Sequence, residues 1–303
     1  PVTVDEFRFG PGETYDVMVE PQDYAYTIFA QSMERSGYAR GTLSVRQGLT
    51  APVPEPDPPE WLTMKDMMGA MGGGAMGHDM MKMDSMGQTK MDHSQMSGGM
   101  AMDHSMHGMQ QGSDNPLAKP SSTIHHARTE YGASVDQRVD TPRTNLDDPG
   151  IGLRNLSQRG LRPQGHRVLT LADLKSIDGV LDDRRPPARE LELHLTGNME
   201  RYSWSFDGLE FGKSTPVSLR HNERVRIILQ NDTMMTHPMH LHGMWSELET
   251  DQGELRVRRH TIPVQPAQRI SYLTTPHDLG RWAWHCHLLF HMDAGMFREV
   301  VVS

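Results

Sequence analysis

One cysteine, Cys286, occurs in 303 residues, and it lies between two histidines in the run WHCH (284–287). Because a lone cysteine cannot be half of an internal disulfide, a role as a thiolate is considered first. His291 and Met296 follow it in the chain. A cysteine thiolate, two imidazoles and a weak methionine thioether are the ligands of a blue-copper centre. The remaining imidazole is found upstream, in HPMHLHG (237–243), so the sequence predicts a copper site built from two distant motifs.

The spacing of these histidines suits an extended strand, in which successive side chains point to opposite faces. We expect His285 and His287 to project to one side and Cys286 to the other. The cysteine can then bind one copper while its neighbours reach a different metal cluster, which gives a short covalent path for electrons. The HLH run (240–242) repeats this arrangement, and His237 can turn toward the cysteine side. One His-x-His pair is more often structural, but two such pairs, together with a flanked lone cysteine and the His and Met that follow it, favour metal binding.

The two motifs resemble a known family. HPMHLHG (237–243) and HCHLLFHMDAGM (285–296) are similar to the last two copper motifs of the multicopper oxidases. Longer stretches of the sequence, such as LHLTGNMERYSWSFDG (193–208), resemble the bacterial copper-resistance oxidases of this family. The resemblance covers residues 1–50 and about 166–303, with a looser match between them.

Carried over by position, the resemblance implies a role for eight residues. The type 1 copper ligands would be His237, Cys286, His291 and Met296, His240 would serve the type 2 copper, and His242, His285 and His287 would serve the type 3 pair. Electrons would pass from the type 1 site through Cys286 and the adjoining His285 and His287 to a trinuclear cluster. O2 would be reduced to water there.

The chain departs from the family in its number of His-x-His motifs. The trinuclear cluster of these oxidases takes eight histidines, four of them from an N-terminal cupredoxin domain. This sequence has two His-x-His pairs, and the histidines at 125–126 and 104–107 have a different spacing. The chain also opens at Pro1 in strand-like sequence. We therefore expect a fragment with a complete type 1 site, incomplete type 2 and type 3 sites, and no N-terminal cupredoxin domain.

Three parts are expected along the chain. Residues 1–50 resemble the C-terminal strands of a middle cupredoxin domain, with short strands at 15–20 and 24–30. Residues 51–165 would comprise a proline-rich linker, a methionine- and histidine-rich segment and an irregular connector. Residues 166–303 are predicted to form a C-terminal cupredoxin domain, which carries the type 1 copper site and half of the trinuclear-site ligands.

Residues 64–109 contain 15 of the 24 methionines and four histidines, but almost no Leu, Ile, Val or aromatic residues. Such a composition cannot form a packed core and favours disorder without metal. Thioethers are soft ligands that select Cu(I). We interpret the segment as copper-collecting, with a passive linker as the alternative. The accessory ligands would be Met80, Met81, Met83, Met91, His93, Met96, Met102, His104, Met106, His107 and Met109.

Alternation of apolar and polar residues predicts half-buried strands after residue 166. Leu193 and Leu195 alternate with Glu192 and His194, so His194 is expected to face solvent rather than a metal. Several short strands with turns between them predict an all-β fold, a cupredoxin-like Greek-key β-sandwich. A partial second cupredoxin domain and the irregular methionine-rich segment would complete the chain.

Composition excludes some classes of function. A net charge of −9 disfavours nucleic acid, whose binding requires a basic surface. The mean hydropathy is −0.60, and no apolar run approaches the ~20 residues of a membrane-spanning helix. The family resemblance alone implies a periplasmic location.

The resemblance implies an enzyme that oxidises Cu(I), with phenols as further reductants, in copper resistance. Methionines beside the first motif (Met234, Met235, Met239 and Met244) either bind Cu(I) or fill the core. Glu247 and Glu249 either line a cation path or form a solvated strand face. A non-enzymatic copper carrier with one blue-copper site is the alternative function. Copper nitrite reductase and a trimeric two-domain laccase match the motifs less well.

Overall fold

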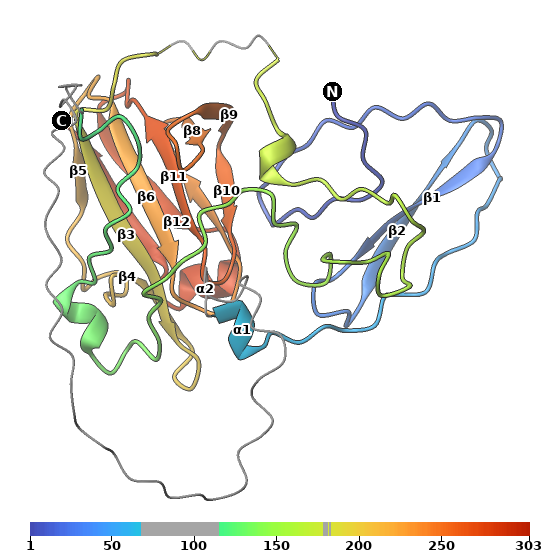
Figure 1. The fold of residues 1–303 in the computed structure, drawn as a ribbon, viewed down its shortest axis with the longest axis horizontal. Helices are drawn as coiled ribbons and strands as arrows, with labels where there is room; N and C mark the ends of the chain where they lie inside the picture. Colours follow the sequence, from blue (N-terminus) through green and yellow to red (C-terminus); the bar gives the residue numbers. More distant parts are fainter. Residues whose placement is uncertain (68–114, 178–180, 182) are drawn as a thin grey trace, which may run out of the picture.

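The computed structural model describes residues 1–67, 115–177, 181 and 183–303. Within these ranges, two β-sheets pack face to face as a sandwich, and a separate hairpin lies beside it (Figure 1). The larger sheet has the order β4-β3-β6-β11-β8-β9, with bounds Ser203–Phe206, Arg189–Asn198, Val225–Asn231, Arg269–Thr274, Ser246–Glu249 and Leu255–Arg259. The smaller has the order β10-β7-β12-β13-β5, with bounds Thr261–Val264, His237–Leu241, Gly280–Cys286, Phe297–Val302 and Val217–Leu219.

This architecture confirms the predicted all-β sandwich. Most neighbouring strands are antiparallel, but β3 pairs with β6 and β13 with β5 in the parallel sense. Parallel neighbours cannot be joined by a tight hairpin, so the chain crosses between the sheets to connect them. Short helices complete the described structure: α1 (Met64–Met67), η2 (Arg128–Tyr131), η3 (Leu171–Asp173) and α2 (Leu289–Asp293).

The hairpin at the N-terminal side of the chain consists of β1 (Ala25–Gln31) and β2 (Tyr38–Ser44). The strand expected at 24–30 is therefore found. The strand expected at 15–20 is wrong, because this stretch has no ladder partner in the described part of the chain and leaves Val17 and Met18 58% and 79% exposed. A strand needs a neighbour to satisfy its backbone groups, which alternation alone does not supply.

Residues 1–60 are fixed to the rest of the chain by charged contacts. Arg162 forms ion pairs with both Glu6 and Asp57. Glu13 accepts a hydrogen bond from Arg259 at 2.8 Å, at the edge of the sandwich. The Arg259 contact brings the N-terminal segment against β9, and Gly10 lies beside Pro238 of β7.

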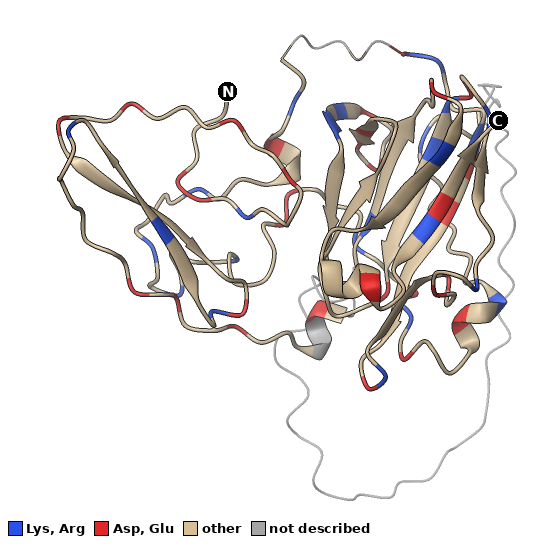
Figure 2. Cartoon of the chain, turned by 180° about the vertical axis from the view of Figure 1, so that it is seen from behind, with Lys and Arg blue, Asp and Glu red and all other residues tan. Residues whose placement is uncertain are grey.

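The outer face of the larger sheet is charged and covered. Arg226 is 1% exposed, pairs with Glu249 at 2.6 Å, and donates to the carbonyls of Leu117 and Lys119. The connector, residues 115–165, thus lies over strands that alternation predicts to be half-exposed. Glu247 is also buried and pairs with Arg224. Glu247 and Glu249 therefore do not form a solvated strand face. Figure 2 shows acidic and basic residues interspersed over the molecule.

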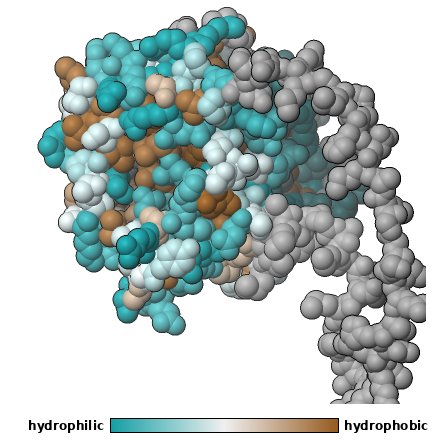
Figure 3. Space-filling model, turned by 60° about the vertical axis from the view of Figure 1, so that its left-hand side comes forward, coloured by the Kyte–Doolittle hydropathy of each residue, from teal (hydrophilic) through white to brown (hydrophobic). Residues whose placement is uncertain are grey.

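On the face of the molecule that Figure 3 shows, teal hydrophilic residues surround a group of brown apolar residues. Within the described ranges, the helices are all too short or too polar to cross a membrane.

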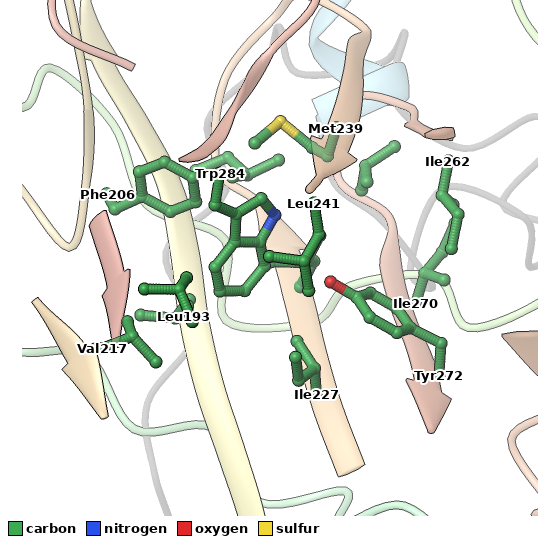
Figure 4. Packing of buried hydrophobic residues seen from close by; sticks show 14 of the residues in the cluster. Leu193, Phe206, Val217, Ile227, Met239, Leu241, Ile262, Ile270, Tyr272 and Trp284 are labelled. Carbon is green, nitrogen blue, oxygen red and sulfur yellow. The ribbon is translucent and has the colours of Figure 1, made fainter. Parts of the chain in front are cut away.

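Aromatic and branched side chains from both sheets meet between them. The indole of Trp284, fully buried in β12, lies against Phe206 at a centroid distance of 5.4 Å (Figure 4). Leu241 of β7 and Ile227 of β6 approach from the two sheets, and both are at most 2% exposed. Cys286 belongs to the same cluster, so the predicted metal ligand lies in the hydrophobic core.

Trp284→Ala should lower the free energy of unfolding by about 3–5 kcal/mol, because it removes one of the two largest fully buried side chains. Trp61→Ala is the matched control, since Trp61 is 79% exposed. Chemical denaturation of the two variants measures the difference. Equal stabilities would contradict the packing described above.

Candidate metal centre

Cys286, His237 and His291 form a closed group of donor atoms. The Cys286 sulfur lies 3.6 Å from His237 Nδ1 and 3.7 Å from His291 Nδ1, and the two nitrogens are 3.0 Å apart. All three residues are buried. The structure thus brings together three of the four residues predicted as one copper site, from β7, β12 and α2.

Strand register explains how the two histidine motifs are positioned. β7 and β12 are antiparallel neighbours in which His285 lies opposite His240, and Cys286 lies opposite Met239. Alternation along β12 therefore sends Cys286 into the core and His285 to the other face of the sheet. His287 follows the strand and continues the ladder through its N–H to Pro238.

The His237 ring is held in one orientation. Its Nε2 lies 2.7 Å from the hydroxyl of Thr233, which itself donates to Asn231 at 2.8 Å. The hydroxyl must then accept from Nε2–H, which leaves the lone pair on Nδ1 facing Cys286. Trp204 packs on the same group, stacked on His291 at 4.1 Å and edge-on to His237 at 5.1 Å. Neither Thr233 nor Trp204 was predicted as a site residue.

Met296 reaches this region through the turn after α2. Its N–H donates to the His291 carbonyl at 2.9 Å, and its carbonyl accepts the Cys286 N–H at 3.1 Å. Gly295 makes the turn with a φ of +119°, where a side chain would also meet Trp204. Met296 is fully buried in the same hydrophobic cluster as Cys286.

Burial sets the charge state of this group. It raises the pKa of the Cys286 thiol to about 12 and lowers that of His291 to about 4. Burial, together with the neighbouring His291, also lowers the pKa of His237 well below its usual value. At neutral pH the imidazoles therefore have free lone pairs, while the thiol keeps its proton until a metal displaces it.

The donor set fits a soft metal in trigonal coordination. Bond lengths of about 2.0–2.1 Å to imidazole and about 2.3 Å to thiolate place nitrogen and sulfur about 3.8 Å apart in a trigonal plane. The two sulfur distances match this value, and the nitrogens lie somewhat closer together. Two histidines, one cysteine and a nearby methionine are the set preferred by blue copper.

A second group of imidazoles lies on the other face of the smaller sheet. The ring centroids of His240 and His285 are 5.7 Å apart, and His242 Nε2 lies 3.1 Å from His285 Nε2. His287 is within 5.7 Å of His240 and 5.6 Å of His285. The four predicted type 2 and type 3 residues are thus neighbours, and His242 among them is exposed.

Backbone carbonyls orient two of these rings. His240 Nδ1 donates to the carbonyl of His260 at 2.7 Å, and His285 Nδ1 donates to the carbonyl of Cys286 at 3.0 Å. Each ring then presents Nε2 as its lone-pair nitrogen. Such hydrogen bonds behind an imidazole fix the ligating nitrogen of metal sites.

Two of these imidazoles, His240 and His242, border an open cleft of about 550 Å³, which Met244, Trp245 and His260 also line. His260 was not predicted, because it stands alone in the sequence. Gly12 of the N-terminal segment packs on the His287 ring from outside. Its φ of +78° and this close approach both require glycine.

The remaining predicted residues are the methionines beside the first histidine motif and the accessory copper ligands. Met239 is 3% exposed and fills the core, whereas Met235 is 37% exposed and Met244 lines the cleft. The accessory copper ligands between Met80 and Met109 lie outside the described residues.

A buried cysteine–histidine group inside a β-sandwich, with further histidines behind the same strand, defines a copper-binding cupredoxin domain. The family model described as multicopper oxidase matches residues 184–303. Copper resistance protein A of Escherichia coli is 52% identical over 326 positions, which cover 100% of this chain and 50% of that protein. A homolog from Pseudomonas syringae pv. tomato is 50% identical over 304 positions, covering 100% of this chain and 49% of that protein.

Among solved structures, a multicopper oxidase from Campylobacter jejuni is 22% identical, with a TM-score of 0.36, and covers 41% of this chain and 31% of that one. The chain belongs to the multicopper oxidase family, in the group of copper resistance protein A. It spans about half the length of these curated relatives.

Thr233→Val should weaken copper binding at Cys286 by about 10–100-fold, because it frees the His237 ring to present the wrong nitrogen. Competition with a copper chelator measures the affinity. Thr236→Val is the matched control, with the same change one residue before His237. An unchanged affinity in Thr233→Val would show that the hydroxyl does not orient the ring.

Copper affinity at Cys286 should rise about tenfold per pH unit between about pH 6 and about pH 8, because each ion displaces one thiol proton. The imidazoles are already neutral in this range and add no further proton release. Chelator competition at several pH values gives the slope. A slope near zero would mean that the thiol is ionised before the metal binds.

Proposed function

We propose that this chain is the electron-accepting part of a copper-resistance oxidase. In this proposal its type 1 copper is held by His237, Cys286, His291 and Met296. Half of a trinuclear cluster is held by His240 (type 2) and by His242, His285 and His287 (type 3). The observation that carries the proposal is the placing of Cys286 and His285 on opposite faces of β12.

When bound, copper supplies one-electron redox chemistry at both places. The chain's own contribution is the connection between them. Cys286 and His285 are joined by one peptide unit, and the His285 Nδ1–H to Cys286 carbonyl bond adds a second link of 3.0 Å. Trp204 and the surrounding core exclude water from the thiolate side, so electrons enter and leave through ordered side chains.

The proposed substrate is Cu(I), which loses one electron to become Cu(II), with phenols as further reductants. Four such electrons and four protons reduce one O2 to two waters. Three features support Cu(I): the methionine-rich segment in the sequence, Met244 in the cleft beside His240 and His242, and the copper-resistance relatives. The periplasmic location implied by the family belongs to the same proposal.

A separate observation favours a second candidate, a copper carrier without oxidase activity. Within the described ranges the open histidine group supplies four imidazoles, and His242 is exposed. A cluster that activates O2 needs further ligands, which an N-terminal cupredoxin domain would provide as a partner. Without that partner the chain would bind and pass on copper and electrons only.

Copper-loaded wild type and His285→Gln should both show thiolate-to-copper absorption that Cu(I) bleaches, whereas Cys286→Ser should lack it. When the N-terminal half of copper resistance protein A is supplied, wild type should consume O2 with Cu(I), and His285→Gln should not. A band retained in Cys286→Ser would overturn the type 1 assignment. A normal band without O2 uptake in any sample would favour the carrier.

A further inference from the structure

A second buried group of imidazoles and carboxylates lies where the connector meets the larger sheet, apart from the copper ligands. It comprises His126, Glu130 of η2, His194 of β3 and Asp232 after β6. One donor atom from each lies within 4.8 Å of the others. In Figure 1, η2 is the green turn beside β3 and β4.

All four side chains are withdrawn from solvent. Glu130 and Asp232 are 0% exposed, His194 is 1% exposed, and the His126 side chain is 8% exposed. The expectation that His194 faces solvent is therefore wrong. The alternation of β3 does place His194 opposite the core leucines, but the connector covers that face.

Distances among the donor atoms fit one small ion. His194 Nδ1 lies 2.9 Å from Asp232 and 3.3 Å from Glu130, and His126 Nδ1 lies 2.7 Å from Glu130 and 3.7 Å from Asp232. A tetrahedral ion with bonds of about 2.0–2.1 Å places its ligands about 3.3–3.4 Å apart. The four distances bracket that value.

One of the two imidazoles, His194, is oriented by a carboxylate behind it. His194 Nε2 lies 3.0 Å from Glu192, which is itself held by Arg269 at 2.6 Å. His126 Nε2 lies 3.4 Å from the exposed carboxylate of Asp140 and forms no hydrogen bond within the described ranges. A carboxylate that holds one ring nitrogen while the other faces the metal is the usual outer shell of a histidine ligand.

The carboxylates each have one oxygen committed elsewhere. Glu130 Oε1 accepts the Ala127 N–H at 2.7 Å, and Asp232 Oδ1 accepts from Gln230 at 2.9 Å. The second oxygen of each faces the two Nδ1 atoms. Both carboxylates therefore present a single inward oxygen, as monodentate ligands do.

The two buried carboxylates need positive charge at this place. In the described part of the chain, the ion pairs of Glu130 and Asp232 are with imidazoles rather than with Arg or Lys. Buried anions need a positive partner. Although burial alone lowers it, hydrogen bonds to Asp232, Glu130 and Glu192 raise the pKa of His194 to about 11. The surroundings of His194 thus favour positive charge, which a proton on its ring or one divalent ion can supply.

We propose that His126, Glu130, His194 and Asp232 bind a divalent transition-metal ion, distinct from the copper sites. Two nitrogens and two oxygens in a tetrahedral arrangement suit Zn²⁺. Binding displaces the Nδ1 proton of His194 to solvent and places the ion between the two rings and the two carboxylates. The ion would fasten η2 to β3 and to the loop after β6, and so hold the connector on the sheet.

The test is zinc content after equilibrium dialysis of the copper-loaded chain, in which copper already occupies the Cys286 and HLH sites. Wild type should retain about one zinc equivalent more than His126→Gln or Asp232→Asn, since each variant removes one of the four ligands. His125→Gln is the matched control, because His125 precedes His126 in the chain and its own side chain is 73% exposed. It should retain the wild-type zinc content.

Equal zinc in all four proteins would overturn the proposal. A measurement on wild type alone remains decisive if the variants fail to fold. Crystals soaked in Zn²⁺ should give an anomalous peak between His126, Glu130, His194 and Asp232. No peak there would leave a proton-bridged ion-pair network only, and the metal site would be rejected.

Discussion

Cys286 can reach a metal only because β12 carries it between the two sheets, and the same strand turns its neighbour His285 outward. Side chains of a strand alternate, so one peptide unit separates a dry, sulfur-containing site from an open group of imidazoles. The pairing of β12 with β7 adds the histidines of the first motif to both groups. Other features of the fold, including the α2 turn that brings back His291, serve to close the sulfur site.

Burial then determines the chemistry of each group. Around Cys286 the core keeps imidazoles neutral and the thiol protonated, so the site is prepared for a cation and is not charged in advance. Thr233 and Trp204 fix the rings without binding a metal themselves. On the other face, His242 is exposed and His240 borders a cleft. This histidine group is therefore accessible to ligands and metal ions from solvent.

Sequence motifs predicted the composition of both histidine groups, because their residues are close in the chain and strand alternation places them. The structure puts those residues together, while their copper roles rest on the proposal. Contacts between distant segments were not predictable in this way. The alternation of its strand predicted that His194 would be exposed, but the connector covers it. Thr233, Trp204 and His260 carry no spacing signal, since each acts through a neighbour that folding alone provides.

The most direct test of the sulfur site is copper X-ray absorption on the chain loaded with one equivalent of copper. We predict one short copper–sulfur contact and two copper–nitrogen contacts, from Cys286, His237 and His291. A spectrum with nitrogen and oxygen neighbours but no short sulfur contact would contradict this account, because copper would then occupy the outer histidines and leave the core cysteine unused.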